Sequence, residues 1–249
     1  MSARNVAGQT PEKSMDGLLL IDKPAGMSSH DVVAVVRRSL GGVRTGHAGT
    51  LDPFATGLLL VLLGKATKTQ SALMSLPKRY ETIAQLGALS STGDTEGEIT
   101  WTGKLPPEQP ELPTGELRQR PPIYSAVKIG GERAYKRARR GESFEMPERI
   151  VTVTRFQQLW RDPDCPPELR DGSPPTQPFP RAGFAIECGS GTYVRSLIAD
   201  LGDAYCLELR RTAIGPFEVS DAVAPPPRGE PWRDPPLIAL DQAFGTLSK

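Results

Sequence analysis

Runs and periodicities of apolar residues predict an alternation of strands and helices along this chain. Residues 17–22 (GLLLID) and 57–64 (GLLLVLLG) are short and almost continuously apolar, which is typical of buried strands. The segment between them predicts an amphipathic helix, because apolar residues recur there at helical spacing, at Val32, Val33, Val36 and Leu40. A capping-box sequence, Ser28 followed three positions later by Asp31, predicts where this helix begins.

Four later segments also carry recognisable patterns. Residues 79–87, 150–159 and 183–188 predict strands, and residues 193–201 predict a helix that follows a glycine-rich turn. Strands and helices interleave without a regular βαβ repeat and without an internal sequence repeat. The sequence therefore predicts an α+β fold built on a mixed sheet.

Prolines divide the chain into structured and looped parts. Six lie in residues 106–122, seven in 161–181 and six in 225–236. Proline lacks a backbone donor and breaks helices and central strands, so these stretches predict loops. We expect residues 161–181 to form a surface loop, residues 1–14 to be a disordered tail, and residues 15–249 to form a single catalytic domain.

Composition excludes several classes of protein. The longest purely apolar run, residues 58–63, is far shorter than the roughly 20 residues of a membrane span. The first residues are polar and lack the apolar core of a secretory signal, so we expect a cytoplasmic protein. Three widely spaced cysteines and two histidines fit neither a disulfide framework nor a zinc site. We therefore expect chemistry without a metal.

The net charge of +1 is uninformative, but the distribution of charge is not. Residues 118–140 contain eight basic side chains and one acidic side chain, Glu132. Such an imbalance is typical of segments that neutralise phosphates. A solvated helix face would have the same composition, and the residues alone leave both interpretations open.

A polar, glycine-rich segment separates the predicted helix from the second predicted strand. It spans residues 44–57 (RTGHAGTLDPFATG), and its glycines permit close approach of the backbone to a ligand. Pro53 biases the preceding residue, Asp52, toward an extended conformation. From the residues alone, an ordinary loop in which Asp52 makes a turn hydrogen bond is the favoured interpretation.

A family resemblance changes that interpretation. The segment GHAGTLDPFATGLLLVLLGKATK (46–68) closely resembles the central motif of the bacterial tRNA pseudouridine-55 synthases, the TruB type. Five further segments resemble motifs of the same family in the same order: GLLLIDKPAGMSSHDVV (17–33), KRYETIAQLG (78–87), RPPIYSAVKIGGERAYKRARRGE (120–142), GSGTYVRSLIADLG (189–202) and LRRTAIGPF (209–217). Six ordered matches are far more specific than any one of them.

The resemblance implies a fold and a set of catalytic residues. The fold would be that of the pseudouridine synthases, a mixed and largely antiparallel sheet flanked by helices, with a basic thumb insertion at about residues 122–150. Asp52 would be the nucleophile, a role that suits a carboxylate able to form a covalent adduct and then leave. Arg195 would pair with Asp52 and keep it ionised. Tyr80 would stack on the flipped uracil.

The resemblance also implies an RNA-binding set. His47 would fill the space vacated by the flipped nucleotide, and Leu209 would wall the uracil pocket. For Lys23 and Lys65, both near the cleft in the family, a structural role and a phosphate-contacting role are equally plausible. The basic thumb would clasp the T-stem loop of tRNA through Lys128, Arg133, Lys136, Arg137, Arg139 and Arg140.

We therefore expect a monomeric enzyme that isomerises uridine 55 of the tRNA T-loop without cofactor or metal. About thirty residues follow the last motif, so the resemblance implies a form without the family's carboxy-terminal RNA-binding domain. Two alternatives stay open. One is a non-catalytic module that binds or folds RNA, and the other is a uridine isomerase that acts on a different structured RNA.

Overall fold

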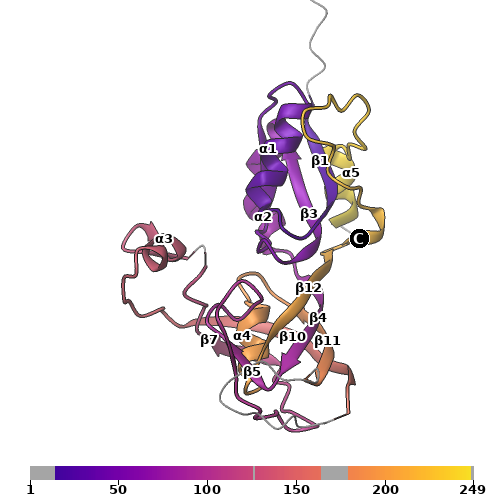
Figure 1. Ribbon diagram of the computed structural model, residues 1–249. Coiled ribbons are helices and arrows are strands. Elements are labelled where there is room, and N and C mark those ends of the chain that lie inside the picture. Colours follow the sequence, from indigo (N-terminus) through magenta and orange to yellow (C-terminus); the bar gives the residue numbers. More distant parts are fainter. Residues whose placement is uncertain (1–14, 126, 164–178, 248–249) are drawn as a thin grey trace, which may run out of the picture.

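The computed structural model describes residues 15–125, 127–163 and 179–247, shown in Figure 1. The predictions for residues 1–14 and for most of 161–181 lie outside these residues. The helices are α1 (Ser29–Ser39), α2 (Gln70–Ser75), α3 (Ala134–Arg139), α4 (Val194–Ala199) and α5 (Leu240–Leu247), with short 3₁₀ turns η1 (Gly64–Thr69) and η2 (Val219–Asp221). The strands are β1 (Gly17–Lys23), β2 (Thr45–Ala48), β3 (Thr56–Leu63), β4 (Lys78–Leu86), β5 (Ala88–Ser90), β6 (Ile99–Trp101), β7 (Gly115–Gln119), β8 (Lys128–Ile129), β9 (Glu132–Arg133), β10 (Arg149–Arg161), β11 (Arg181–Cys188), β12 (Ala204–Ile214) and β13 (Phe217–Glu218).

One nine-stranded sheet runs through the molecule. Its order is β1-β3-β12-β4-β11-β10-β7, with β2 paired to β3 and β13 paired to β12. Among the pairings of this sheet, only β3 with β12 is parallel. The predicted α+β fold with a mixed, largely antiparallel sheet is confirmed.

The upper half of the molecule in Figure 1 explains the continuous apolar runs of the sequence. Strands β1 and β3 are buried on both faces, so apolar residues follow one another without alternation from Leu18 to Ile21 and from Leu58 to Leu63. Leu19, Ile21, Leu59, Val61 and Leu63 pack with Val32 and Val36 of α1 on one face. The alternate leucines pack on the other face against Leu73 of α2 and Ala243 of α5, and these are Leu18, Leu20, Leu58, Leu60 and Leu62.

The predicted element boundaries agree with the structure to within one or two residues. Helix α1 begins after Ser28, whose side chain and that of Asp31 form the predicted reciprocal capping box. Its buried face differs in one position, because Val35 is buried and Val33 is only half-buried. Residues 193–201 contain α4, which is shorter than predicted.

Strand β12 lies at the centre of the sheet and was not predicted as a strand. Its charged residues, Glu208, Arg210 and Arg211, hide the apolar pattern of a central strand. It meets β3 at Gly57, whose φ is +100°, and a Cβ atom there would lie 2.8 Å from the backbone nitrogen of Arg211. Glycine is therefore required at residue 57 for β3 and β12 to pair.

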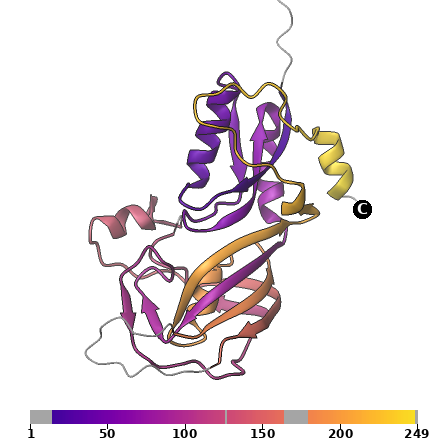
Figure 2. The same cartoon turned by 45° about the vertical axis from the view of Figure 1, so that its right-hand side comes forward.

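The lower half of the molecule contains β4, β5, β7, β10, β11 and β12, with α4 packed in the same core (Figures 1 and 2). Leu197 and Ile198 of α4 join Phe184 and Ile186 of β11 in its core. The predicted thumb projects from this half as the β8–β9 hairpin followed by α3, which lies apart from the body in both views (Figures 1 and 2). None of the helices in the described ranges is long and apolar enough to cross a membrane.

Candidate active site

The loop that carries Asp52 follows β2 and precedes β3, and hydrogen bonds from several directions hold it. Ser29, the first residue of α1, is fully buried. Its hydroxyl accepts a hydrogen bond from the backbone nitrogen of Leu51 (2.8 Å) and donates one to the carbonyl of the same residue (3.1 Å). One side chain thus fixes both polar groups of the residue that precedes Asp52.

Lys23 holds the other side of this loop. Its ammonium is fully buried and donates to the carbonyls of Met27 (2.6 Å), Pro24 (2.8 Å) and Pro53 (3.2 Å). Burial lowers the pKa of Lys23 to about 8, although the negative charge of Asp52 opposes the shift. Of the two roles open to Lys23, these contacts favour the structural one, because the carbonyl of Pro53 adjoins Asp52.

Arg211 of β12 closes the third side. Its guanidinium is buried and donates to the carbonyls of Leu58 (2.7 Å), Gly49 (2.9 Å) and Thr50 (3.4 Å). In the sheet Arg211 lies opposite Tyr80 of β4. The strand that was not predicted therefore supplies the cation that links the Asp52 loop to Tyr80.

Arg195 forms an ion pair with Asp52, as predicted, with 3.0 Å between Nε and Oδ2. Its side chain is only 3% exposed, so this is not a surface salt bridge. Asp94, equally buried, lies 2.9 Å from Nη1 of Arg195. The guanidinium also donates to the carbonyls of Thr92 (2.7 Å) and Tyr124 (3.0 Å), which leaves it little freedom to turn.

Two opposing effects set the pKa of Asp52. Burial raises the pKa of this carboxyl above its usual range, and the guanidinium of Arg195 opposes the rise. The carboxylate of Asp94 adds to the rise, and the ammonium of Lys23 reduces it. Arg195 therefore favours the ionised form of Asp52, as predicted, but does not outweigh burial.

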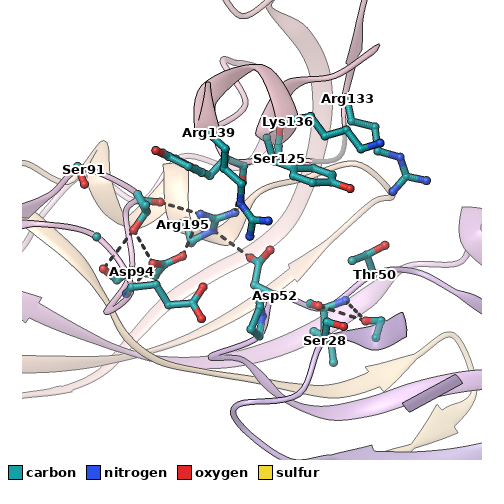
Figure 3. A pocket seen from close by; sticks show the side chains of 18 of the residues that line it. Ser28, Thr50, Asp52, Ser91, Asp94, Ser125, Arg133, Lys136, Arg139 and Arg195 are labelled. Carbon is teal, nitrogen blue, oxygen red and sulfur yellow. Dashed lines mark hydrogen bonds and ion pairs between the residues drawn. The ribbon is translucent and has the colours of Figure 1, made fainter. Parts of the chain in front are cut away.

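A large cleft of about 1230 Å³ opens above Asp52, between the two halves of the molecule. Asp52, Asp94 and Arg195 line it on one side, and Ser28, Ser29 and His30 line it on another. Three thumb cations, Arg133, Lys136 and Arg139, face it from above (Figure 3). A carboxylate thus lies at the bottom of a cleft whose roof is cationic.

A second cavity of about 310 Å³ lies on the other side of Asp52 and Arg195, which line both spaces. Its walls include Tyr80, Leu209, Arg211 and Tyr193. Its volume is at the lower end of the range for small-molecule pockets, about 300–1,000 Å³. The predicted pair of Tyr80 and Leu209 therefore meets beside Asp52. Burial raises the pKa of the Tyr80 phenol, so it keeps its proton at neutral pH.

His47 lies in β2, close to the cleft but not in its lining. Its ring packs edge-on against His30 with centroids 5.4 Å apart, and His30 does line the cleft. The Nδ1 atom of His47 is buried without a hydrogen-bond partner among the described residues. Burial lowers the pKa of His47 to about 4, so its ring is neutral at physiological pH.

Besides His47 and Lys23, four of the residues predicted to bind RNA line neither cavity. Lys65 is 76% exposed and pairs with Asp16 at 3.4 Å. Lys128 is exposed on β8. Arg137 and Arg140 make ion pairs with Glu132 and Glu142 of the thumb itself.

Three residues of the site were not singled out from the sequence: Ser29, Asp94 and Arg211. Asp94 had a signal in the polar segment 87–98 (GALSSTGDTEGE), which follows a predicted strand as functional loops do. Ser29 and Arg211 had none, because a capping serine and a strand arginine are ordinary residues until the fold buries them. Within the described part of the chain, no group of three His, Cys, Asp or Glu side chains is placed to hold a metal.

Comparison with known proteins identifies the family of this chain. Residues 37–194, which include Asp52, Tyr80 and Asp94, match the family described as TruB family pseudouridylate synthase (N terminal domain). The chain belongs to this family. The predicted membership of the TruB type is confirmed, and with it the prediction of a pseudouridine synthase.

Relatives of the TruB family align over most of the chain. The tRNA pseudouridine synthase B of Corynebacterium aurimucosum is 42% identical over 219 residues, which are 83% of this chain and 69% of that protein. That of Opitutus terrae is 40% identical over 225 residues, covering 86% of this chain and 87% of that protein.

Solved structures share the fold. A Cbf5 chain in a Cbf5–Nop10–Gar1 complex has a TM-score of 0.56 at 29% identity, covering 86% of this chain and 56% of that chain. The structure of an H/ACA RNP bound to a substrate RNA containing 2′-deoxyuridine has a TM-score of 0.52 at 28% identity, covering 82% of this chain and 49% of that chain. This TruB-family chain thus spans about half the length of these structural neighbours.

Proposed function

We propose that this chain isomerises uridine to pseudouridine in tRNA, at uridine 55 of the T-loop, with Asp52 as the nucleophile. One observation carries the proposal: Asp52 lies between a large cation-roofed cleft and a small cavity, paired with a buried arginine. The cleft suits an RNA backbone and the small cavity suits one base. The relatives named tRNA pseudouridine synthase B support the choice of substrate.

The net reaction breaks the N1–C1′ bond of uridine and forms a C5–C1′ bond. C5 loses one proton and N1 gains one, so atoms and electrons balance without an oxidant or reductant. The reaction needs a group that attacks the sugar or the base and then leaves, and a carboxylate suits this role. Three routes meet these requirements: attack at C1′, attack at C6, and passage through a glycal.

Arg195 and Asp94 are assigned supporting roles. Arg195 favours the ionised form of Asp52 in opposition to burial and fixes its direction, since its guanidinium is itself held by Asp94 and two carbonyls. A catalytic group that is held in one geometry before the substrate arrives loses little entropy in the transition state. Asp94 is therefore a positioning residue that acts through Arg195.

We assign the small cavity to the flipped uracil. A carboxylate cannot reach the reacting atoms of a stacked nucleotide, the ribose C1′ and the ring atoms of the uracil, so the nucleotide must leave the stack, which costs a few kcal/mol. The ring of Tyr80 would stack on the extruded base and Leu209 would contact its edge. Because the phenol of Tyr80 keeps its proton, Tyr80 is not a base before the substrate binds. We assign Tyr80 to stacking and hydrogen bonding.

His47 and the thumb would contact the rest of the T-loop. A neutral imidazole beside the cleft can fill the gap that the nucleotide leaves, without the cost of burying a charge. Arg133, Lys136 and Arg139 would meet phosphates, which position the RNA rather than specify its sequence. All the groups named belong to one chain, so we propose that a monomer is the active form, acting in the cytoplasm on tRNA.

The test is release of tritium from a tRNA transcript labelled at C5 of uridine, with wild type and Asp52→Asn compared. C5 loses its hydrogen only when it becomes the new glycosidic carbon. We expect release that approaches one per tRNA in the wild type and none above background in the variant. Release that survives the substitution would mean that Asp52 is not the nucleophile. Binding without release in the wild type would leave a non-catalytic RNA-binding module.

A second candidate is the same isomerisation in another structured RNA. It is favoured by the structural neighbour bound to a substrate RNA in an H/ACA RNP, an assembly other than a tRNA complex. Competition with unlabelled tRNA, an isolated T-arm hairpin and an unrelated structured RNA separates the two. We expect tRNA and the hairpin to compete and the unrelated RNA not to.

A further inference from the structure

The thumb has a defined conformation even though its helix is short. Gly130 and Gly131, with φ of 60° and 89°, form the two-residue turn of the β8–β9 hairpin, as a type I′ turn requires. Helix α3 follows directly and has six residues, far fewer than a helix needs to be stable alone. Contacts outside the helix must therefore hold it.

The end of α3 places an acidic residue beside two arginines. Gly141, with φ of 73°, ends the helix, and the backbone nitrogens of Gly141 and Glu142 bond to the carbonyls of Ala138 (2.9 Å) and Arg137 (3.2 Å). This is the Schellman pattern. It turns the chain back so that the carboxylate of Glu142 faces the last turn of the helix.

Four side chains then form a chain of ion pairs, which we call the thumb brace: Glu132, Arg140, Glu142 and Arg137. Arg140 binds Glu132 through two parallel hydrogen bonds of 2.7 Å and bonds to Glu142 through Nε at 2.8 Å. The second oxygen of Glu142 accepts from Nε of Arg137 at 2.7 Å. The guanidinium of Arg137 also lies over the ring of Phe144, 4.7 Å from its centre.

The brace joins parts of the thumb that are separate along the chain. Glu132 belongs to the hairpin, the arginines belong to the end of the helix, and Glu142 lies beyond it. Its two positive and two negative charges cancel. Two carboxylates engage all three nitrogens of Arg140 and offset its charge, so a phosphate gains less from contacting Arg140 than from contacting an unpaired cation.

Three further cations of the thumb have no such partners. Arg133, Lys136 and Arg139 make no ion pair with any of the described residues, and all three line the cleft above Asp52. Lys136 and Arg139 are three positions apart and share one helix face, whereas Arg137 and Arg140 share the next face round. Figure 3 shows Arg139 extending from the helix toward Asp52.

We propose that the basic residues of the thumb form two sets with different functions. Arg133, Lys136 and Arg139 contact the phosphates of the bound RNA, while Arg137 and Arg140 position them by holding the thumb in shape through Glu132 and Glu142. This inference rests on the proposed function, since it presupposes an RNA in the cleft. It implies that two acidic residues, Glu132 and Glu142, favour the binding of a polyanion.

The first test is the salt dependence of tRNA binding by the full chain. Each phosphate contact adds about 0.9 to the slope of log K against log of salt concentration. We expect Lys136→Gln to weaken binding and to reduce the slope by about that amount. We expect Arg140→Gln to weaken binding at every salt concentration without reducing the slope. A slope that falls equally in both variants would overturn the division.

The second test uses the sign of a charge change. Glu132→Gln combined with Glu142→Gln makes the protein more positive by two charges, which by simple attraction should tighten tRNA binding. With the brace removed we expect binding to weaken by about threefold to tenfold, since the thumb loses the ion pairs that hold its shape. Tighter or unchanged binding would mean that Arg137 and Arg140 are themselves phosphate ligands, and that Glu132 and Glu142 weaken their contacts with the RNA.

A matched control removes two carboxylates elsewhere. Glu108 and Glu111 lie in the loop before β7, and Glu108→Gln with Glu111→Gln changes the net charge equally without touching the brace. We expect this pair to bind tRNA as well as the wild type or better. Wild type that releases no tritium and binds no tRNA would contradict the proposed function itself. If the wild type releases tritium and binds tRNA, but the Glu132/Glu142 variant binds tRNA more tightly than the Glu108/Glu111 control, only the division of the thumb is contradicted.

Discussion

Asp94 and Asp52 face the same guanidinium from two sides. Oδ2 of Asp94 lies 2.9 Å from Nη1 of Arg195, and Oδ2 of Asp52 lies 3.0 Å from its Nε. Asp94 is almost fully buried, whereas the side chain of Asp52 is 34% exposed to the cleft. One carboxylate therefore anchors the arginine, and the other is presented to whatever enters the cleft.

Asp94→Asn is expected to change the proposed activity in two separable ways. It frees Arg195 to move, and a displacement of about 1 Å at a reacting group can lower kcat by about 100-fold. It also removes a charge that raises the pKa of Asp52. Ionisation of Asp52 would then be complete at lower pH, so the acidic limb of the kcat profile should shift to lower pH while the plateau falls.

The matched control for this prediction is Glu116→Gln, which removes an exposed carboxylate of β7 that lines neither cavity. We expect its pH profile to match the wild type within about threefold, because Glu116 makes no ion pair with the described residues. An unchanged plateau in Asp94→Asn would show that Asp94 does not position Arg195. The profile is measured by tritium release under single-turnover conditions.

Ser29→Ala should loosen the loop that carries Asp52. It leaves both backbone groups of Leu51 without their buried partner, which destabilises the protein by about 1–3 kcal/mol. We expect kcat to fall by at least tenfold and tRNA affinity to stay within about twofold, because the loop positions a reacting group rather than a phosphate contact. Urea unfolding and single-turnover rates check the two parts.

Ser39→Ala serves as the comparison, since Ser39 ends the same helix and its hydroxyl bonds only to the carbonyl of Val36 at 2.9 Å. It should lower the free energy of unfolding slightly and leave kcat unchanged. Equal losses of kcat in the two serine variants would indicate that general destabilisation, not the Asp52 loop, limits activity.

Gly57→Ala is expected to prevent β3 and β12 from pairing. A Cβ atom at residue 57 would collide with the carbonyl oxygen of Arg211 and lie 2.8 Å from its nitrogen, and φ there is +100°. Strain and overpacking together should lower the free energy of unfolding by about 3 kcal/mol or more. Gly41→Ala, where φ is +69° but nothing lies within 4 Å, should cost only about 1 kcal/mol. Thermal unfolding followed by circular dichroism compares them, and equal losses would refute the steric explanation.

His47 should make stability depend on acid pH. Its pKa is about 4 in the folded state and 6.5 in the unfolded state, so the unfolded state binds the proton first as the pH falls. The contribution of His47 is therefore complete above pH 6.5 and is lost as the pH falls from 6.5 to 4, by about 2 kcal/mol once partial exposure is allowed for. Urea unfolding at several pH values measures this loss.

His47→Gln cannot take up that proton, so the free energy of unfolding of this variant should fall less over the same interval. His30→Gln is the appropriate control, because His30 is exposed and packs against the same ring. The prediction fails if His47→Gln and the wild type lose stability in parallel between pH 6.5 and 4.

The predicted elements are those with a regular pattern of apolar residues, either continuous along a buried strand or repeated at helical spacing along one face of a helix. Strands β1 and β3 and helix α1 are of this kind, and their burial follows the apolar pattern almost residue by residue. Strand β12 is not, because Arg211 points into the protein while Glu208 and Arg210 interrupt the pattern. No periodicity predicts that an arginine will be buried, since its burial depends on carbonyl groups of a loop far away in sequence.

The same distinction holds at the site. The sequence by itself determined the α+β class, the apolar cores of β1, β3 and α1, the family, and the pairing of Asp52 with Arg195, which followed from the family's motifs. Only the tertiary structure decided that Asp94 anchors Arg195, that Lys23 is a buried support of the Asp52 loop, and that Arg137 and Arg140 pair within the thumb. Apolar patterning is a local property, because it records which face of an element avoids water. The partners of a charge are set by which distant backbone and side-chain groups the fold brings within about 3 Å.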